Sequence, residues 1–273
     1  PLPFVMVIVY PLRMSITLTV IGGGNMAKAI IQGALVGEVL EGSEIAIADP
    51  EQTSREFFAK LGCTVVESAQ ELPESACTLL AIKPQVFESI AHCIQAPVVY
   101  SIMAGISTAQ IADKVGHSRI VRIMPNLPCS IGYGAAGIAL GSSAKTEDAV
   151  LAHTLFSTIG IVVDVEEKEI DAVTAVSGSG PAYLFLLAEA MIEGGVQAGL
   201  SRETASLLTQ QTVLGASELL VRDAQTAGQL REAVTSKGGT TAAALQVLQE
   251  RDVSKAIAEA IVAARDRGRE LGN

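Results

Sequence analysis

The chain is short of positive charge. Its 273 residues include 19 lysines and arginines against 29 aspartates and glutamates, which gives a net charge of −10 at pH 7. Proteins that bind nucleic acid need a basic surface, because contacts to phosphate dominate the affinity. The composition therefore argues against nucleic acid as a partner. Any anionic ligand must instead be bound by local backbone N–H groups and individually placed cations.

Cysteine and histidine are scarce and widely spaced. The four cysteines form no C-x-x-C pair, and the three histidines have no spacing typical of a zinc site. We therefore expect no metal ion and reduced thiols, as in a cytoplasmic protein. The chain also lacks any Ser-His-Asp, Cys-His or H-E-x-x-H arrangement, so nothing favours acyl transfer or zinc-dependent hydrolysis.

Long hydrophobic runs are missing as well, although 49% of the residues are hydrophobic. Charges or glycines interrupt every apolar stretch before it reaches the roughly 18–20 residues that span a bilayer, so we expect no membrane segment. Residues 2–10 are apolar, but no basic region precedes them and no clear small-residue cleavage site follows, so they do not indicate a signal peptide. We interpret residues 1–13, which precede Met14, as an extension outside the fold.

A glycine-rich turn follows the apolar, β-branched run at residues 16–21. The spacing Gly22-x-Gly24-x-x-Ala27 is typical of a dinucleotide-binding turn, in which small residues permit the tight turn, the approach of a pyrophosphate and close packing of a helix. An ordinary strand-to-helix turn is the alternative. A second apolar run ends at Asp49, and an acid at that place usually binds the ribose of the cofactor.

Apolar, β-rich runs alternate with helical patterns up to about residue 165, which is typical of an α/β domain. We expect strands at 16–21, 44–48, 76–82, 97–102, 119–123, 134–140 and 160–165, and helices near 25–36, 51–61, 85–95, 107–115 and 145–159. A sheet of this kind binds its ligand at the carboxyl ends of its strands. Prolines and glycines there either let the backbone face a ligand or simply end the strands.

Beyond residue 170 the strand signal disappears, and Ala, Leu, Glu and Gln recur at helical spacing. Helices are expected near 167–176, 180–198, 201–222, 226–234, 240–249 and 252–270. Several are apolar around much of their circumference, which favours an interface between subunits over a merely well-packed core. We therefore expect an α/β dinucleotide-binding domain at 14–166 and an all-helical dimerisation and substrate domain at 167–273.

Two polar segments rich in small residues interrupt the helical region, at 177–181 and 235–241. Both resemble helix starts, with serines before Pro181 in the first and glycines and threonines in the second. A helix N-terminus with clustered hydroxyls and free N–H groups can bind a carboxylate, whereas plain helix caps are the alternative. The adjacent glycines at 238 and 239 favour close approach of a ligand to the backbone.

Five segments together resemble pyrroline-5-carboxylate reductase. They are Ile-Gly-Gly-Gly-Asn-Met-Ala at 21–27, Ile-Lys-Pro at 82–84, Met-Pro-Asn at 124–126, Val-Ser-Gly-Ser-Gly-Pro-Ala-Tyr at 176–183 and Val-Thr-Ser-Lys-Gly-Gly-Thr-Thr at 234–241. The resemblance implies a Rossmann-type domain, a helical dimerisation domain and often a pentamer of such dimers. It also implies reduction of the C=N bond of 1-pyrroline-5-carboxylate by NADPH or NADH to give L-proline, the last step of proline biosynthesis.

The resemblance further implies roles for individual residues. Asp49 would bind the adenosine ribose, and Asn126 would help to place the nicotinamide. The other cofactor residues would be Gly22, Gly23, Gly24, Asn25 and Met26 at the pyrophosphate, and Ala81, Ile82, Lys83, Pro84 and Ala104 near the ribose and nicotinamide. The substrate residues would be Ser236, Gly238, Gly239, Thr240 and Glu167, with Thr241 facing the ring nitrogen as the catalytic residue. Leu127 and Lys237 depart from the family, which often has threonine and proline there.

The lack of a strong acid fits this chemistry. Hydride adds to a C=N carbon that is already polarised, and with a bound iminium no proton moves in the hard step. A threonine hydroxyl would orient the ring and pass a solvent proton. Two alternatives remain, of which a β-hydroxyacid-dehydrogenase-like enzyme would need a lysine and asparagine pair that residues 183–187 do not offer. A non-catalytic dinucleotide-sensing dimer would not need the loop at 236–241.

Overall fold

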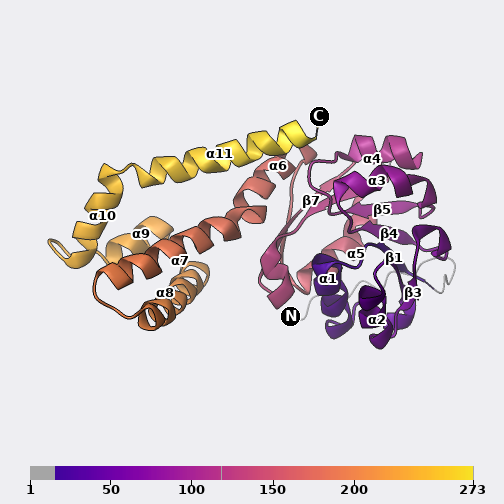
Figure 1. The fold of residues 1–273 in the computed structure, drawn as a ribbon. Coiled ribbons are helices and arrows are strands. Elements are labelled where there is room, and N and C mark those ends of the chain that lie inside the picture. Colours follow the sequence, from indigo (N-terminus) through magenta and orange to yellow (C-terminus); the bar gives the residue numbers. More distant parts are fainter. Residues whose placement is uncertain (1–15, 118, 273) are drawn as a thin grey trace. The chain divides into compact units, whose positions relative to one another are not determined.

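The computed structural model describes residues 16–117 and 119–272 (Figure 1). The chain divides into two compact units. Unit 1 consists of Pro1–Gly178 together with Asp266–Asn273, and unit 2 consists of Ser179–Arg265. The expectation for residues 1–13 lies outside the described residues.

Unit 1 is built on an eight-stranded sheet with the strand order β3-β2-β1-β4-β5-β6-β7-β8. Neighbouring strands run parallel except for β6 and β7, which pair antiparallel. The strands are β1 (Leu18–Ile21), β2 (Ile45–Ala48), β3 (Thr64–Val66), β4 (Cys77–Leu80), β5 (Val98–Ser101), β6 (Ile120–Met124), β7 (Gly134–Leu140) and β8 (Gly160–Asp164). This order places the carboxyl ends of β2, β1, β4 and β5 side by side.

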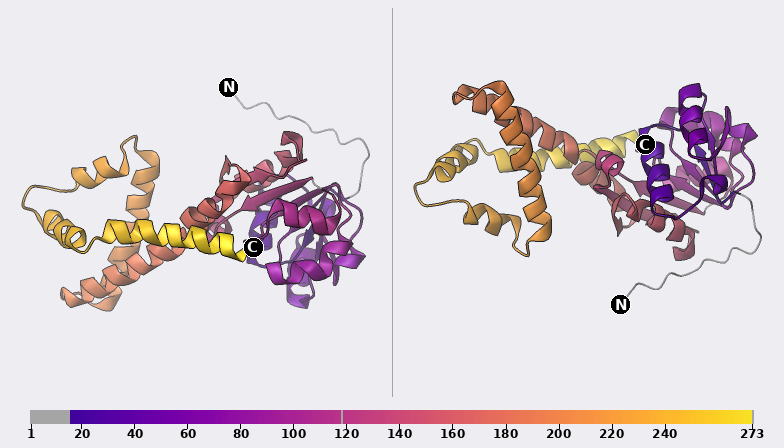
Figure 2. Two further views of the ribbon diagram at one scale, coloured as in Figure 1. Left: turned by 90° about the horizontal axis from the view of Figure 1, so that it is seen from above. Right: turned by 90° about the horizontal axis from the view of Figure 1, so that it is seen from below.

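Helices cover both faces of this sheet, as Figure 2 shows from two further directions. The α-helices of unit 1 are α1 (Asn25–Val36), α2 (Gln52–Lys60), α3 (Pro84–Ile90), α4 (Thr108–Val115), α5 (Thr146–Ser157) and α6 (Ile170–Val173). Short helical turns join them: η1 (Gly42–Glu44), η2 (Ala69–Glu71), η3 (Ala91–Cys93), η4 (Leu127–Ile131), η5 (Glu167–Glu169) and the π-helical η6 (Thr174–Gly178). Helices α1, α2 and α5 cover one face, and α3 and α4 cover the other.

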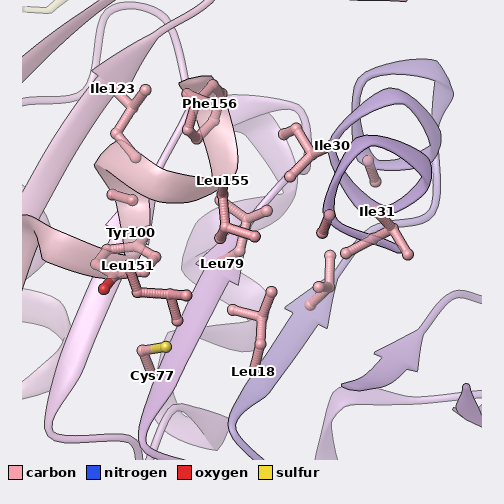
Figure 3. Close-up of a cluster of buried hydrophobic side chains, with 14 of the residues drawn as sticks. Leu18, Ile30, Ile31, Cys77, Leu79, Tyr100, Ile123, Leu151, Leu155 and Phe156 are labelled. Atoms are coloured by element: carbon pink, nitrogen blue, oxygen red, sulfur yellow. The ribbon is translucent and has the colours of Figure 1, made fainter. Parts of the chain in front are cut away.

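The core of unit 1 lies on both sides of the sheet. Leu79 on β4 packs in one cluster with Ile30 of α1 and Phe156 of α5 (Figure 3). Its neighbour Leu80 points to the other face and belongs to a second cluster with Phe87 of α3. Because successive residues of a strand face opposite sides, a parallel sheet covered on both faces needs apolar residues at consecutive positions. This is the physical reason for the continuous apolar runs in the sequence.

Unit 2 is helical. Its helices are α7 (Gly180–Gln197), α8 (Arg202–Arg222), α9 (Ala227–Ala233), α10 (Thr240–Glu250) and the greater part of α11 (Val253–Leu271), whose last residues belong to unit 1. Large apolar side chains remain exposed on it, among them Phe185 at 58%, Leu186 at 66% and Leu207 at 62%. The predicted architecture, a Rossmann-type α/β domain followed by helices, is confirmed.

Two local features differ from the sequence-based expectation. Strand β3 was not predicted, because only three residues form it and the first, Thr64, is exposed. The helix expected at 167–176 is not a uniform α-helix. It begins as the 3-10 turn η5, continues as α6 and ends in the π-helical turn η6.

Candidate functional site

The glycine turn between β1 and α1 is shaped by its surroundings. Gly22 has a φ of +97°, and a Cβ atom there would lie 2.5 Å from the carbonyl oxygen of Ala81. A Cβ atom on Gly23 would lie 2.1 Å from Oγ of Ser54. At Gly24, in contrast, nothing lies within 4 Å of the Cβ position. The first two glycines are therefore required by local packing, and the third leaves open space in front of α1.

The N-terminus of α1 faces this open space. Gly24 is the N-cap residue and has no side chain with which to cap the helix, and Asn25 and Met26 begin the first turn. The first N–H groups of a helix have no partner within it, and together with the helix dipole they attract a phosphate. The room and the donors therefore fit the pyrophosphate of a dinucleotide.

Asp49 follows β2 and bonds directly to the glycine turn. Its Oδ2 accepts a hydrogen bond from the N–H of Gly23 at 2.6 Å, and its Oδ1 accepts one from the N–H of Glu51 at 2.8 Å. Each carboxylate oxygen keeps a further lone pair for a ribose hydroxyl. Arg55 donates from Nη1 to the carbonyl oxygens of Asp49 and Pro50, at 2.8 and 2.7 Å. The sequence did not predict these links, which hold the carboxylate beside the turn.

The carboxyl end of β4 lies next to that of β1, and the carboxyl end of β5 follows. The N–H of Ala81 donates to the carbonyl oxygen of Ile21 at 2.9 Å, which joins β4 to β1 just before the glycines. Lys83 is the exposed N-cap residue of α3, and Pro84 begins that helix. Ala104 is exposed in the segment after β5. The strand order thus places the predicted cofactor residues at 22–26, 49, 81–84 and 104 after the carboxyl ends of four neighbouring strands.

Asn126 lies after β6 and is 9% exposed. Its Nδ2 donates to the carbonyl oxygen of Ser177 at 3.2 Å, and its Oδ1 accepts from the N–H of Ala135 at 2.9 Å. The side chain thus ties η6 to the beginning of β7, and one amide hydrogen remains for a ligand. Its predicted contact with the nicotinamide stays a prediction.

Glu167 is engaged with the start of α4. Its Oε1 accepts a hydrogen bond from the N–H of Thr108 at 2.6 Å, and its Oε2 accepts one from Thr108 Oγ1 at 2.5 Å. Arg122 lies beneath, with Nη1 3.7 Å from Glu167 Oε1 and Nη2 3.7 Å from Asp171 Oδ1. Burial lowers the pKa of Arg122, and the two carboxylates oppose that shift.

Sequence reasoning missed Arg122 and Thr108. A signal for Arg122 was available, because it is the cation in the strand Ile-Val-Arg-Ile-Met, whose five residues are all buried. A charge in such a strand needs partners of opposite charge, since an unpaired buried ion is very costly. No comparable signal pointed to Thr108, which lies 59 residues from Glu167 in the sequence.

The segment before α10 forms a tight turn in unit 2. Gly238 has a φ of +71°, and the N–H of Gly239 donates to the carbonyl oxygen of Ser236 at 3.0 Å. A Cβ atom on Gly239 would lie 2.3 Å from Ser236 Oγ, so a larger residue there would displace that hydroxyl. Gly239 is the N-cap residue of α10, and Thr240 and Thr241 begin the helix. The turn thus carries three hydroxyls, those of Ser236, Thr240 and Thr241, at an uncapped helix start, which is a suitable site for a carboxylate.

The exposure of this turn allows a ligand to approach. Ser236, Lys237, Gly238 and Thr240 are exposed, and Thr241 is half-buried. Elsewhere in the described residues, no group of three His, Cys, Asp or Glu side chains is arranged to hold a metal ion.

One helical stretch is long and largely apolar. By length and composition alone, residues 167–197 could cross a membrane, and 6% of an 18-residue apolar section of it is buried. Asp171, Gly178 and Gly180 interrupt the stretch, as the sequence analysis expected. A large exposed apolar surface is equally typical of a contact with another protein chain.

Family models match both parts of the chain. A model described as "Pyrroline-5-carboxylate reductase dimerisation" matches residues 167–271. A model described as "NADP oxidoreductase coenzyme F420-dependent" matches residues 17–105, which include the glycine turn. The first match covers the apolar helical stretch and relates it to dimer formation.

Whole-chain relatives agree with these matches. The chain is 40% identical to the pyrroline-5-carboxylate reductase of Synechocystis sp. over 265 residues, which cover 95% of this chain and 99% of the relative. It is 38% identical to the enzyme of Pisum sativum, with 94% and 96% covered.

Solved structures give the same result. The pyrroline-5-carboxylate reductase of Coxiella burnetii superposes with a TM-score of 0.86 at 35% identity, covering 95% of this chain and all of that one. A Plasmodium falciparum pyrroline carboxylate reductase with NADP bound superposes with a TM-score of 0.82 at 28% identity, covering 94% and 98%. Since relatives of such identity match almost end to end, the chain belongs to the pyrroline-5-carboxylate reductase family.

Proposed function

We propose that this chain reduces 1-pyrroline-5-carboxylate to L-proline with NADPH or NADH, the last step of proline biosynthesis. The observation that carries the proposal is the presence in one chain of two separate sites. One is the open helix start behind the glycine turn, and the other is the turn at 236–241. The first would fit many dinucleotide-binding proteins, whereas the second adds a place for a small carboxylate substrate.

The cofactor is proposed to lie across the carboxyl ends of the strands. Its pyrophosphate would meet the N–H groups after Gly24, where space is open in front of α1. Asp49 would accept hydrogen bonds from the adenosine ribose. The ribose and nicotinamide would lie against the residues after β4 and β5, which include Lys83 and the exposed Ala104.

The substrate is proposed to bind through its carboxylate at the start of α10. Backbone N–H groups at 239–241 and the Ser236 hydroxyl would donate to that carboxylate, and the glycines would let it approach. Thr241 would orient the ring through its nitrogen. The bound dihydronicotinamide supplies the hydride, and a held substrate turns the reaction into a step within one complex. A threonine hydroxyl is too weak an acid to protonate nitrogen alone, so it would relay a proton from solvent.

Assembly and location form part of the same proposal. The family is dimer-forming, and the apolar helices of unit 2 offer the surface for it. We propose a pentamer of dimers in the cytoplasm. Light scattering of the purified protein would test the assembly, because ten chains and two chains differ fivefold in mass.

The activity is tested by a cofactor assay. Absorbance of NADPH or NADH should fall when 1-pyrroline-5-carboxylate is added, and L-proline should form in equal amount. Binding of the cofactor without any turnover would contradict the proposal and indicate a sensor. The variant Ser236→Ala should raise KM for the imine more than it changes cofactor affinity, because the hydroxyl is proposed to contact only the substrate.

A further inference from the structure

The Glu167 carboxylate is already used inside unit 1. Both of its oxygens accept hydrogen bonds from Thr108, one from the backbone N–H at 2.6 Å and one from Oγ1 at 2.5 Å. A carboxylate that accepts a short hydrogen bond at each oxygen and lies beside a buried guanidinium has a fixed position. This arrangement does not favour a direct contact with substrate.

Thr108 is the first residue of α4, directly after the N-cap residue Ser107. The first N–H groups of a helix lack partners within the helix, and a negative charge near them is stabilising. Glu167 satisfies one of these donors and supplies that charge. It thereby fixes the end of the segment 102–107, which connects β5 to α4 and contains Ala104.

Part of this segment borders a cavity. Gly105, with a φ of +75°, and Ser107 both line an open cavity of about 310 Å³ together with Arg122 and Asp171. On its other side Gly105 is buried against Leu271. Because glycine has wide backbone freedom, the hydrogen bonds at Thr108 help to hold the end of the segment in place.

The guanidinium of Arg122 helps to hold the Glu167 carboxylate in place. Its guanidinium, with a side chain only 6% exposed, lies 3.7 Å from both Glu167 and Asp171. A buried arginine needs carboxylates beside it to compensate its charge. This pairing holds the Glu167 carboxylate at the start of α4.

We propose that Glu167 is a positioning residue for the cofactor and not a substrate contact. Anchored by Arg122, its carboxylate fixes Thr108 and, through it, the segment that presents Ala104 to the nicotinamide side of the cofactor. This inference rests on the cofactor site of the proposed function. It predicts that loss of the Glu167–Thr108 contact weakens cofactor binding and leaves substrate affinity nearly unchanged.

The test compares Thr108→Val with Thr108→Ser in the full chain. Valine removes the hydroxyl donor to Glu167 and leaves Arg122 paired, whereas serine retains the donor. We expect the valine variant to raise the dissociation constant of the reduced cofactor, measured by fluorescence titration without substrate, by roughly 3–10-fold. The serine variant should stay within about twofold, and KM for 1-pyrroline-5-carboxylate should stay within about twofold in both.

A second arm uses Glu167→Gln and a double-mutant cycle. Glu167→Gln should lower cofactor affinity at least as much as Thr108→Val does. The double variant should have the same affinity as Glu167→Gln alone, because both substitutions remove the same contact. Amide hydrogen exchange of these variants without cofactor should be faster at residues 102–108 than in the unmodified chain. The matched control is Arg119→Gln, which breaks the Arg119–Asp148 ion pair at the opposite edge of the same sheet and should leave cofactor affinity unchanged.

Several outcomes would overturn the inference. One is a raised KM for the imine with unchanged cofactor affinity in Glu167→Gln, which would make Glu167 a substrate residue. Another is an equal loss of cofactor affinity in Arg119→Gln, which would reduce the effect to general stability. Unchanged cofactor affinity in Thr108→Val also overturns it, even if hydrogen exchange rises. Failure of the unmodified chain to bind either cofactor would instead contradict the proposed function.

Discussion

At the scale of single residues, Thr241 carries the chemistry in the proposed mechanism. Its hydroxyl is proposed to face the ring nitrogen, and it does not cap α10, so Thr241→Ala should fold and bind cofactor normally. We expect kcat to fall roughly 10–1000-fold, since one hydrogen bond to the reacting group is lost. Steady-state kinetics with Thr241→Ser as the control checks this, because serine keeps the hydroxyl and should retain most of the activity. Near-normal turnover in the alanine variant would leave Thr241 as a helix-start residue only.

Asp49 should favour NADH over NADPH. Its carboxylate is held beside the turn by the N–H groups of Gly23 and Glu51, so a 2′-phosphate would meet a fixed negative charge. Arg55 cannot easily offset this, because it already donates to two carbonyl oxygens and lies 4.0 Å from Glu67. Specificity constants for the two cofactors measure the preference, and a strong preference of the unmodified enzyme for NADPH would contradict it.

A matched pair of variants isolates the effect of this charge. Asp49→Ser should shift the ratio of the two specificity constants toward NADPH by roughly tenfold, because the repulsion disappears. Its lost bond to Gly23 affects both cofactors and cancels in the ratio. Glu51→Gln removes the same charge two residues away without touching the hydrogen bonds of Asp49, and it should change the ratio less than about twofold.

At the scale of elements, the glycine turn separates packing from binding. Gly23→Ala places a Cβ atom 2.1 Å from Ser54 Oγ and should destabilise unit 1 by about 1–3 kcal/mol. Gly24→Ala meets no atom within 4 Å and has an ordinary φ of −68°, so the fold should tolerate it. The added methyl group fills the space proposed for the pyrophosphate and should weaken cofactor binding. Thermal melting and cofactor titration of both variants distinguish these effects, and equal melting temperatures would contradict the assignment.

How well an element could be predicted depended on whether its signal is local. The buried strands were predictable because both of their faces are covered, which requires runs such as Ile-Ala-Ile-Ala at 45–48. The glycine turn was predictable because all of its glycines lie within a few residues of one another. The contacts of Glu167 with Thr108 and of Asp49 with Gly23 were not, because they join residues 59 and 26 positions apart. Nothing in local spacing encodes such pairs.

At the scale of the whole molecule, unit 2 depends on a partner. Phe185 on α7 is 58% exposed in the single chain, and such surface is unfavourable in water unless another chain covers it. Phe185→Glu should therefore weaken the dimer and raise the fraction of monomer in sedimentation experiments. The control is Val36→Glu on α1, which is 86% exposed in unit 1 and should leave the dimer unchanged. An intact dimer in the first variant would place the interface elsewhere.

Unit 1 is discontinuous in the sequence, which has a consequence for the order of events during synthesis. Gln110 Nε2 donates to the carbonyl oxygen of Gly272 at 2.9 Å, and Gly105 lies against Leu271. On the ribosome all eight strands emerge long before these residues, and domains otherwise tend to fold in order from the N-terminus. The nucleotide-binding unit thus gains its last contacts only after the helical unit has been made. A chain cut after residue 265 should bind the dinucleotide more weakly and still keep its helices. Cofactor titration measures the first property and circular dichroism the second.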